Sequence, residues 1–181
     1  MKIVATEIPD VKLIIPTVYK DHRGYFMESY RESALKDLGI NINFVQDNQS
    51  LSGKGILRGL HFQAPPFSQA KLVKVVQGAV LDVAVDIRAN SPTYGQHVKQ
   101  LLSTKNMHQL LIPKGFAHGF VTLEEDTVFQ YKCGNYYNKE SEGSIYWNDS
   151  QLNIDWGVKD PIISEKDEEA PKFNDFVTPF N

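Results

Sequence analysis

The segment from residue 79 to residue 88 alternates between branched aliphatic side chains and a set dominated by charged ones. Successive side chains of an extended strand point to opposite faces, so this pattern predicts a β-strand rather than a helix. The aliphatic face would carry Leu81, Val83, Val85 and Ile87, and the other face Asp82, Ala84, Asp86 and Arg88. Such a charged face either lies in water or lines a polar cavity.

Other short runs from residue 71 onward share this strand character and are separated by glycine, proline and asparagine. They are Lys71–Val76, His97–Leu102, Gln109–Ile112, His118–Leu123, Thr127–Cys133 and Ser144–Trp147. Short strands at nearly regular spacing predict an all-β chain, folded as an antiparallel sandwich or barrel.

Two short helical segments are expected outside this sheet structure. Ser33 is placed to cap a helix that runs to Leu38, and Gly39 is placed to end it in a left-handed turn. The acidic tail from Ser164 is expected to form one helix packed on the outside of the sheets.

Composition narrows the function classes. The 181 residues carry a net charge of -3, which argues against nonspecific binding to nucleic acid or to an anionic membrane. A single cysteine, Cys133, excludes an internal disulfide and a cysteine-rich zinc site. No apolar run reaches the ~18 residues of a membrane span, and the first residues lack a signal-peptide pattern. We therefore predict one cytoplasmic domain over residues 1–181.

Four polar side chains stand in otherwise apolar segments. They are His61 in LRGLHFQ, Lys71 in AKLVKVV, His118 in GFAHGF and Tyr131 in VFQYKC. Together with the carboxylates of the 79–88 segment, they predict a barrel whose mouth binds a small ligand.

His61 is either a structural histidine or a general base, since imidazole can accept a proton near neutral pH. Strict alternation would place it on the face opposite Arg58. A base needs an orienting carboxylate, and the candidates are Asp82, Asp86 and Asp167. For Asp167 the spacing alone favours another role, a helix-capping pair with Ser164.

The segment from Pro113 to His118 has the PxGxxH spacing of the second cupin motif. Cupins commonly pair this histidine with an HxH motif on an earlier strand to bind a metal, but here Gln63 replaces the second histidine. A metal site built on His61 and His118 stays open as an alternative. Lys71 and Arg58 weigh against it, because fixed cations repel a divalent ion and suit an anionic substrate.

A series of stretches covering nearly the whole chain resembles, in order, the dTDP-4-dehydrorhamnose 3,5-epimerase family of deoxysugar biosynthesis. The stretches are DHRGYFMESY, FVQDNQS, GILRGLHFQ, KLVKVVQGAVLDVAVDIRANSPTYGQ, IPKGFAHGFVTL, YKCGNYY and SEGSIYWND. The resemblance implies a cupin-like antiparallel β-barrel or jelly roll with a few short peripheral helices. It also implies a homodimer with exchanged N-terminal strands and catalysis without a metal or organic cofactor.

The resemblance implies four catalytic residues. His61 matches the proton-abstracting base, Asp167 the carboxylate that orients it, and Tyr131 the general acid on the opposite face. Lys71 matches the group that stabilises the enolate oxygen. The chemistry needs such groups, because both carbons next to the C4 carbonyl exchange protons through an enolate.

The resemblance also implies a set of substrate-contacting residues. Arg23 and Arg58 match phosphate-contacting positions, and Tyr137 matches an aromatic that stacks on the nucleobase. The other matching positions are Glu28, Gln46, Asp47, Asn48, His118, Glu142 and Lys166. The segment from Arg23 to Glu28 would reach the site of the partner subunit.

We therefore expect an isomerase that inverts C3 and C5 of dTDP-4-dehydro-6-deoxyglucose and gives dTDP-4-dehydro-L-rhamnose. The alternatives are an epimerase that inverts one carbon of a related nucleotide sugar, a metal-dependent cupin enzyme, and a noncatalytic nucleotide-sugar binding module. The joint presence of an acid and a base disfavours the last, since binding alone requires neither.

Overall fold

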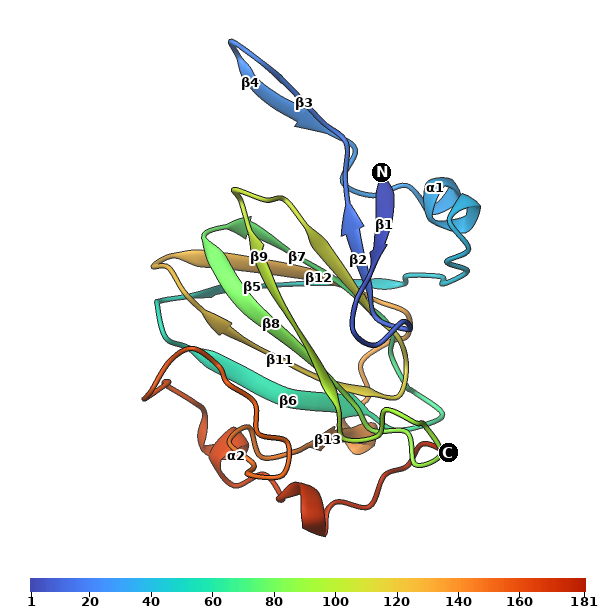
Figure 1. The fold of residues 1–181 in the computed structure, drawn as a ribbon, viewed down its shortest axis with the longest axis vertical. Coiled ribbons are helices and arrows are strands. Elements are labelled where there is room, and N and C mark those ends of the chain that lie inside the picture. The colour runs from blue at the N-terminus through green and yellow to red at the C-terminus, as the bar shows by residue number, and fades with distance from the viewer.

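Two antiparallel sheets face each other in the computed structural model, which describes residues 1–181 (Figure 1). The six-stranded sheet has the order β1 (Lys2–Ala5), β2 (Lys12–Ile15), β10 (Gln109–Ile112), β7 (Lys71–Gln77), β12 (Thr127–Cys133) and β5 (Gln46–Ser52). The five-stranded sheet has the order β13 (Glu142–Ser144), β6 (Leu57–Gln63), β11 (Phe116–Thr122), β8 (Ala79–Asp86) and β9 (His97–Ser103). The predicted all-β, antiparallel class is confirmed.

The predicted strands from residue 71 to residue 133 all exist. The strand expected at Ser144–Trp147 is wrong, because β13 covers Glu142–Ser144 instead. The strand expected to reach Arg88 ends at Asp86. There the Asp86 carboxylate accepts a hydrogen bond from the backbone N–H of Arg88, two residues further along the chain. The short N-terminal strands lie outside the predicted runs.

The helices are short. They are α1 (Glu32–Asp37), α2 (Glu165–Glu168) and the 3-10 turns η1 (Lys139–Ser141) and η2 (Phe173–Asp175). The predicted cap at Ser33 is wrong: Arg31 precedes α1, and no side chain caps it. Gly39 has the left-handed φ of 81° expected after the helix. None of these helices has the length and the apolar composition of a membrane span.

The tail beyond Ser164 is also not one helix. Only four residues form α2, and apart from η2 the remaining chain crosses the outer face of the five-stranded sheet as irregular backbone (Figure 1). Its apolar side chains Phe173 and Phe180 pack there with Val83 and Val85 of β8. This layer explains why the tail avoids a longer helix, since separated anchors cover a wider part of the sheet.

The two faces of β8 settle the choice left by its alternating pattern. Val83 and Val85 point outward to the tail, while Val80 and Ala84 point into the core between the sheets. Asp82 and Asp86 share this inner face, and both are 0% exposed. The charged face is therefore buried and is not a solvated surface.

The N-terminal arm is the hairpin of β3 (Val18–Asp21) and β4 (Gly24–Met27), which projects away from both sheets (Figure 1). It pairs with no other strand of the chain. Its aromatic side chains are open, with Tyr19 at 65%, Tyr25 at 57% and Phe26 at 70% exposure. Large exposed rings on a two-stranded ribbon mark a surface suited to contact with another molecule.

Candidate active site

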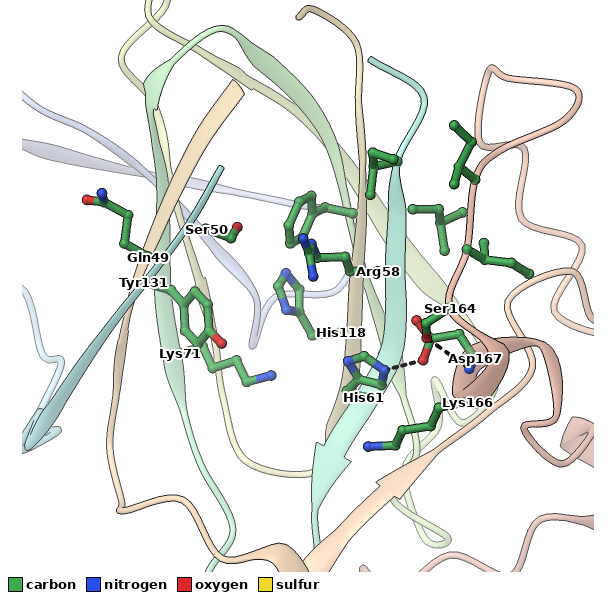
Figure 2. Close-up of a pocket in the computed structure, with 15 residues that line it drawn as sticks. Gln49, Ser50, Arg58, His61, Lys71, His118, Tyr131, Ser164, Lys166 and Asp167 are labelled. Atoms are coloured by element: carbon green, nitrogen blue, oxygen red, sulfur yellow. Dashed lines mark hydrogen bonds and ion pairs between the residues drawn. The ribbon is translucent and has the colours of Figure 1, made fainter. Parts of the chain in front are cut away.

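A cavity of about 410 Å³ opens between the two sheets. Its wall contains the four polar residues singled out in apolar segments, His61, Lys71, His118 and Tyr131 (Figure 2). The structure therefore brings these four side chains together at one cavity, whereas Asp82 and Asp86 of the 79–88 segment do not line it. Both sheets contribute, because His61 lies on β6 of the five-stranded sheet, and Lys71 and Tyr131 lie on β7 and β12 of the six-stranded sheet. The tail contributes Asp167.

His61 and Asp167 form the closest polar pair of the cavity, with His61 Nε2 and Asp167 Oδ1 2.6 Å apart. Burial works to raise the pKa of Asp167, but the hydrogen bond and charge of His61 and the Gly59 backbone N–H keep it below its ordinary value. An ionised carboxylate only accepts, so Nε2 carries the proton. The other ring nitrogen, Nδ1, has no hydrogen-bond partner within the chain.

Asp167 also takes part in the helix start predicted for Ser164. The Ser164 hydroxyl accepts the Asp167 backbone N–H at 3.2 Å, as a cap does. The main partners of the Asp167 carboxylate lie elsewhere, since its Oδ1 pairs with His61 and its Oδ2 accepts the Gly59 N–H at 3.3 Å. Cap and orienting role therefore coexist, because one uses the backbone of Asp167 and the other its carboxylate.

Arg58 lines the same cavity as His61, so the prediction that they face opposite ways is wrong. Pairing between β6 and β11 shifts register between His118 and Phe120, and this bulge changes the alternation. Gly59 lies at the shift with φ of 126°, and an added Cβ would come 2.5 Å from the Gly119 Cα. Only a residue without a side chain allows this approach.

Lys71 and His118 form the inner wall. His118 Nε2 lies 2.9 Å and 3.1 Å from the two oxygens of Asp82. Burial lowers the pKa of His118 against the opposing effect of Asp82, so the ring is neutral at neutral pH. Burial also lowers the pKa of Lys71, against the nearby Cys133 and Asp82. Asp82 thus serves His118 and not His61, for which it was a candidate.

Tyr131 lies across the cavity from His61, with the Lys71 ammonium between them (Figure 2). Lys71 Nζ lies 5.7 Å from the centre of the Tyr131 ring. Burial raises the pKa of Tyr131, so the phenol keeps its proton at neutral pH. The cavity therefore has a free imidazole nitrogen on one side, a protonated phenol on the other and a cation between.

A polar cluster borders the cavity beside β5. Tyr137 donates its backbone N–H to Gln46 Oε1 at 2.9 Å, and Gln46 Nε2 donates to Asn48 Oδ1 at 3.0 Å. The Tyr137 hydroxyl donates to Glu142 at 3.2 Å, and Glu142 pairs with Lys166 at 2.7 Å. These five residues were all predicted substrate contacts.

Three predicted contacts lie elsewhere. Asp47 pairs with Lys132 at 2.9 Å on the other face of β5. Arg23 pairs with Asp21 at the tip of the arm, and Glu28 pairs with Arg31 after it. Within one chain, the structure does not bring Asp47, Arg23 or Glu28 to the cavity.

Several lining residues were absent from the predicted set. They are Gln49, Ser50, Ile56, Leu57, Phe120, Ile162, Ile163 and Ser164. Most are apolar or small and carry no chemical signal of their own. Ser50 could have been found from the alternation of β5, which places it on the face of Gln46 and Asn48.

The two imidazoles do not form a shared ligand set, because each bonds through Nε2 to a different carboxylate. No group of three or more His, Cys, Asp or Glu side chains is arranged to bind a metal ion. The geometry thus offers paired acid–base groups and not the ligand cluster that the metal-dependent alternative needs.

Removing a proton from one side of a bound molecule and returning one from the other is the work of an acid–base isomerase. A barrel with His61 and Tyr131 on opposite walls defines an enzyme of that class. The model of a known family, described as dTDP-4-dehydrorhamnose 3,5-epimerase, matches residues 5–175. The chain belongs to the dTDP-4-dehydrorhamnose 3,5-epimerase family, whose cupin-like fold it shares.

Individual relatives agree over nearly the full length. The dTDP-4-dehydrorhamnose 3,5-epimerase of Salmonella typhimurium is 52% identical over 173 residues, 94% of each chain. The crystal structure of the Elizabethkingia anophelis epimerase is 53% identical, with a TM-score of 0.92 and 97% of each chain covered. An epimerase from Legionella pneumophila, solved in complex with dTDP-4-keto-L-rhamnose, is 49% identical with a TM-score of 0.93, covering 97% of this chain and 94% of that one.

Proposed function

We propose that this chain inverts C3 and C5 of dTDP-4-dehydro-6-deoxyglucose and produces dTDP-4-dehydro-L-rhamnose. The observation that carries the proposal is the opposition of His61 and Tyr131 across one cavity, with Lys71 between them (Figure 2). Family membership and the sugar nucleotide bound to the Legionella pneumophila relative support the same substrate class.

His61 removes the proton in the first step. C3 and C5 both neighbour the C4 carbonyl, so either C–H is acidic enough for an imidazole base. Nδ1 takes the proton while Nε2–H stays bonded to Asp167, whose negative charge stabilises the imidazolium that forms. The short distance between Nε2 and Oδ1 orients the ring for this role.

Lys71 stabilises the enolate. Loss of either proton places negative charge on the C4 oxygen, and this charge exists only along the reaction path. A fixed ammonium in a partly dehydrated cavity therefore lowers the barrier selectively. The nearby Asp82 carboxylate opposes the effect of burial, which lowers the pKa of Lys71.

Tyr131 returns a proton to the opposite face of the ring. One group cannot remove and return the proton on different faces, so inversion needs a second group across the cavity. The Tyr131 phenol is protonated because burial raises its pKa, and it gives its proton to the enolate carbon. The phenolate that results is then reprotonated from solvent.

The nucleotide diphosphate is assigned to the rim. Arg58 lines the cavity and bonds Ser52 at 3.1 Å, which leaves guanidinium donors for phosphate oxygens. Tyr137 is 56% exposed beside the cluster of Gln46 and Glu142, so its ring is open to a nucleobase. Stacking accepts any base, and thymine is assigned through the family.

We also propose a homodimer with exchanged N-terminal arms. Arg23 and Glu28 match substrate contacts of the family, yet they lie outside the cavity of their own chain. The arm that carries Arg23 presents Tyr19, Tyr25 and Phe26 to solvent. An arm that inserts into a partner would bury these rings and complete the partner's site.

Deuterated water tests the reaction. When purified protein is incubated in deuterated water with dTDP-4-dehydro-6-deoxyglucose, the sugar should take up deuterium at C3 and C5 with inversion at both carbons. NMR measures both the label and the configuration. His61→Ala should abolish both. Label and inversion at a single carbon would identify a single-centre epimerase, and no label at either would refute the proposed substrate.

Mixing two inactive variants tests the exchanged arm. If Arg23 serves the partner's site, a dimer of His61→Ala with Arg23→Ala contains one intact site and one doubly altered site. Random pairing should then restore about a quarter of wild-type activity. If each arm served its own chain, both sites of the mixed dimer would stay inactive and mixing would restore nothing.

Organisation as one domain over residues 1–181 and a cytoplasmic location stay predictions. One apolar cluster that includes Val73, Val98 and Phe129 joins strands of both sheets, which supports the first. The single cysteine, Cys133, supports a reducing compartment.

A further inference from the structure

Four side chains share one patch of the inner face where β5 pairs with β12. In this register, Asn48 lies opposite Tyr131 and Gln46 lies opposite Cys133. Side chains two residues apart on a strand point the same way, so all four face the barrel interior. Direct partners across an antiparallel pair have Cβ atoms about 5 Å apart, which places the Asn48 amide beside the Tyr131 ring.

The Asn48 amide is fixed at both ends. Its Oδ1 accepts from Gln46 Nε2 at 3.0 Å, and its Nδ2 donates to Cys133 Sγ at 3.7 Å. Cys133 is fully buried, and Gln46 is itself fixed through its own oxygen by the Tyr137 backbone N–H. Because the carbonyl and one N–H are engaged, the second N–H of Asn48 is left to serve Tyr131.

Tyr131 needs such a donor. When it gives its proton to the enolate carbon, it becomes a phenolate in a cavity that disfavours charge. Burial raises the pKa of Tyr131, and a hydrogen bond from the Asn48 side chain offsets part of this rise. A neutral amide N–H can do this without competing with Lys71 for the negative charge on the substrate.

We propose that Asn48 is a positioning residue for Tyr131, which aims the phenol and stabilises its phenolate through an amide that Gln46 and Cys133 orient. This inference rests on the proposed function, because it assumes that Tyr131 is the general acid. It differs from the substrate contact that family resemblance implies for Asn48, since the group that Asn48 serves is Tyr131.

The two roles give different isotope patterns in deuterated water. If reprotonation by Tyr131 slows while His61 still removes the proton, the enolate is returned by His61 to its original face. Recovered substrate then carries deuterium without inversion. A substrate contact would change affinity, and a structural defect would slow exchange and inversion together.

Asn48→Ala and the isosteric Asn48→Asp should each lower the inversion rate roughly tenfold to a hundredfold, the range of a hydrogen bond to a charged group. The ratio of deuterium exchange to inversion should rise, and KM and the affinity for dTDP should stay within about twofold. Gln130→Ala is the matched control, because Gln130 precedes Tyr131 on β12 and points to the other face.

A double variant sharpens the test. Adding Asn48→Ala to Tyr131→Phe should cause no further loss of inversion, because no phenol is left to position. An unchanged exchange-to-inversion ratio, a loss seen only in KM, or additive losses in the double variant would each overturn the inference. A wild-type protein that fails to invert the substrate would refute the proposed function, and this is measured before any variant.

Discussion

Asp82 and Asp86 lie four residues apart on the inner face of β8, and both are 0% exposed, yet their surroundings differ. Asp86 accepts hydrogen bonds from Arg88, Ser91 and Thr93. Asp82 bonds only His118. Burial works to raise the pKa of both, but the donors around Asp86 outweigh it and lower its pKa to about 2, whereas the pKa of Asp82 stays raised.

The contrast separates a structural end of the barrel from a reactive end. A carboxylate whose acceptor sites are filled has no capacity left for a ligand, so Asp86 fixes the turn after β8. Asp82 has few donors and lies with His118 beside the cavity that Lys71 enters. Equal solvent exposure therefore does not distinguish a structural carboxylate from one beside the cavity. The number of hydrogen-bond donors around the carboxylate distinguishes them better.

The largest expected effect is at the reactive end. His61→Ala should lower kcat roughly 10²- to 10⁴-fold, because it removes the proposed base. The melting temperature should also fall, because the buried Asp167 carboxylate loses its His61 partner, so kcat is compared per folded molecule. The matched control is His97→Ala, which removes an imidazole from β9 outside the site. A His61→Ala protein that keeps its activity would break the distinction between the two ends.

Lys71→Met should lower kcat roughly 10²- to 10³-fold, the usual effect of deleting an electrostatic stabiliser of an oxyanion. KM should move much less, because the enolate charge is absent from the bound ground state. Lys74→Met is the control, since Lys74 lies on the same strand and faces the other way. A loss confined to KM would show that Lys71 binds substrate without stabilising the enolate.

Asp86→Asn should act on stability and not on catalysis. It removes the carboxylate that Arg88 and two hydroxyls share, which costs about 3 kcal/mol of unfolding free energy. Urea unfolding measures this cost, and kcat per folded molecule should equal that of the wild type. A variant with wild-type stability but reduced kcat would reverse the roles assigned to the two ends.

Acid titration sharpens the same point. The folded pKa of Asp86, about 2, lies below the ~3.9 of an unfolded aspartate. Its stabilisation is therefore complete above about pH 4 and is lost as pH falls towards 2. The difference in unfolding free energy between wild type and Asp86→Asn should narrow over that window. A constant difference would mean that the Asp86 charge does not stabilise the fold.

The smallest effect is expected at the start of α2. Ser164→Ala removes the cap on the Asp167 N–H and should cost about 1 kcal/mol of stability, measured by urea unfolding. Activity should fall no more than a few-fold, because the Asp167 carboxylate keeps its bonds to His61 and Gly59. A loss as large as that of His61→Ala would show that the cap determines the geometry of the pair.

Local patterns predicted much of the barrel and part of the site. Alternation placed β8 correctly, and apolar surroundings drew attention to His61, Lys71, His118 and Tyr131, which do meet in one cavity. These signals work because strand periodicity and unusual polarity are properties of short segments.

What could not be predicted depends on contacts between distant segments. The shift that turns Arg58 into the cavity arises from pairing with β11, which no pattern within β6 records. The partner of His61 lies 106 residues away, and the spacing of Asp167 favoured a cap that the structure also contains. The short N-terminal strands lack alternation, because their pairing and burial come from the rest of the sheet.

The separation of His61 from Asp167 has a consequence for biosynthesis. A ribosome that has reached residue 144 has already made every strand of both sheets, but not the carboxylate that orients the imidazole. The same final stretch of chain covers the outer apolar face of β6 and β8. Under the proposed role of His61, a nascent chain should therefore stay inactive towards its substrate until this last segment has been made and has docked.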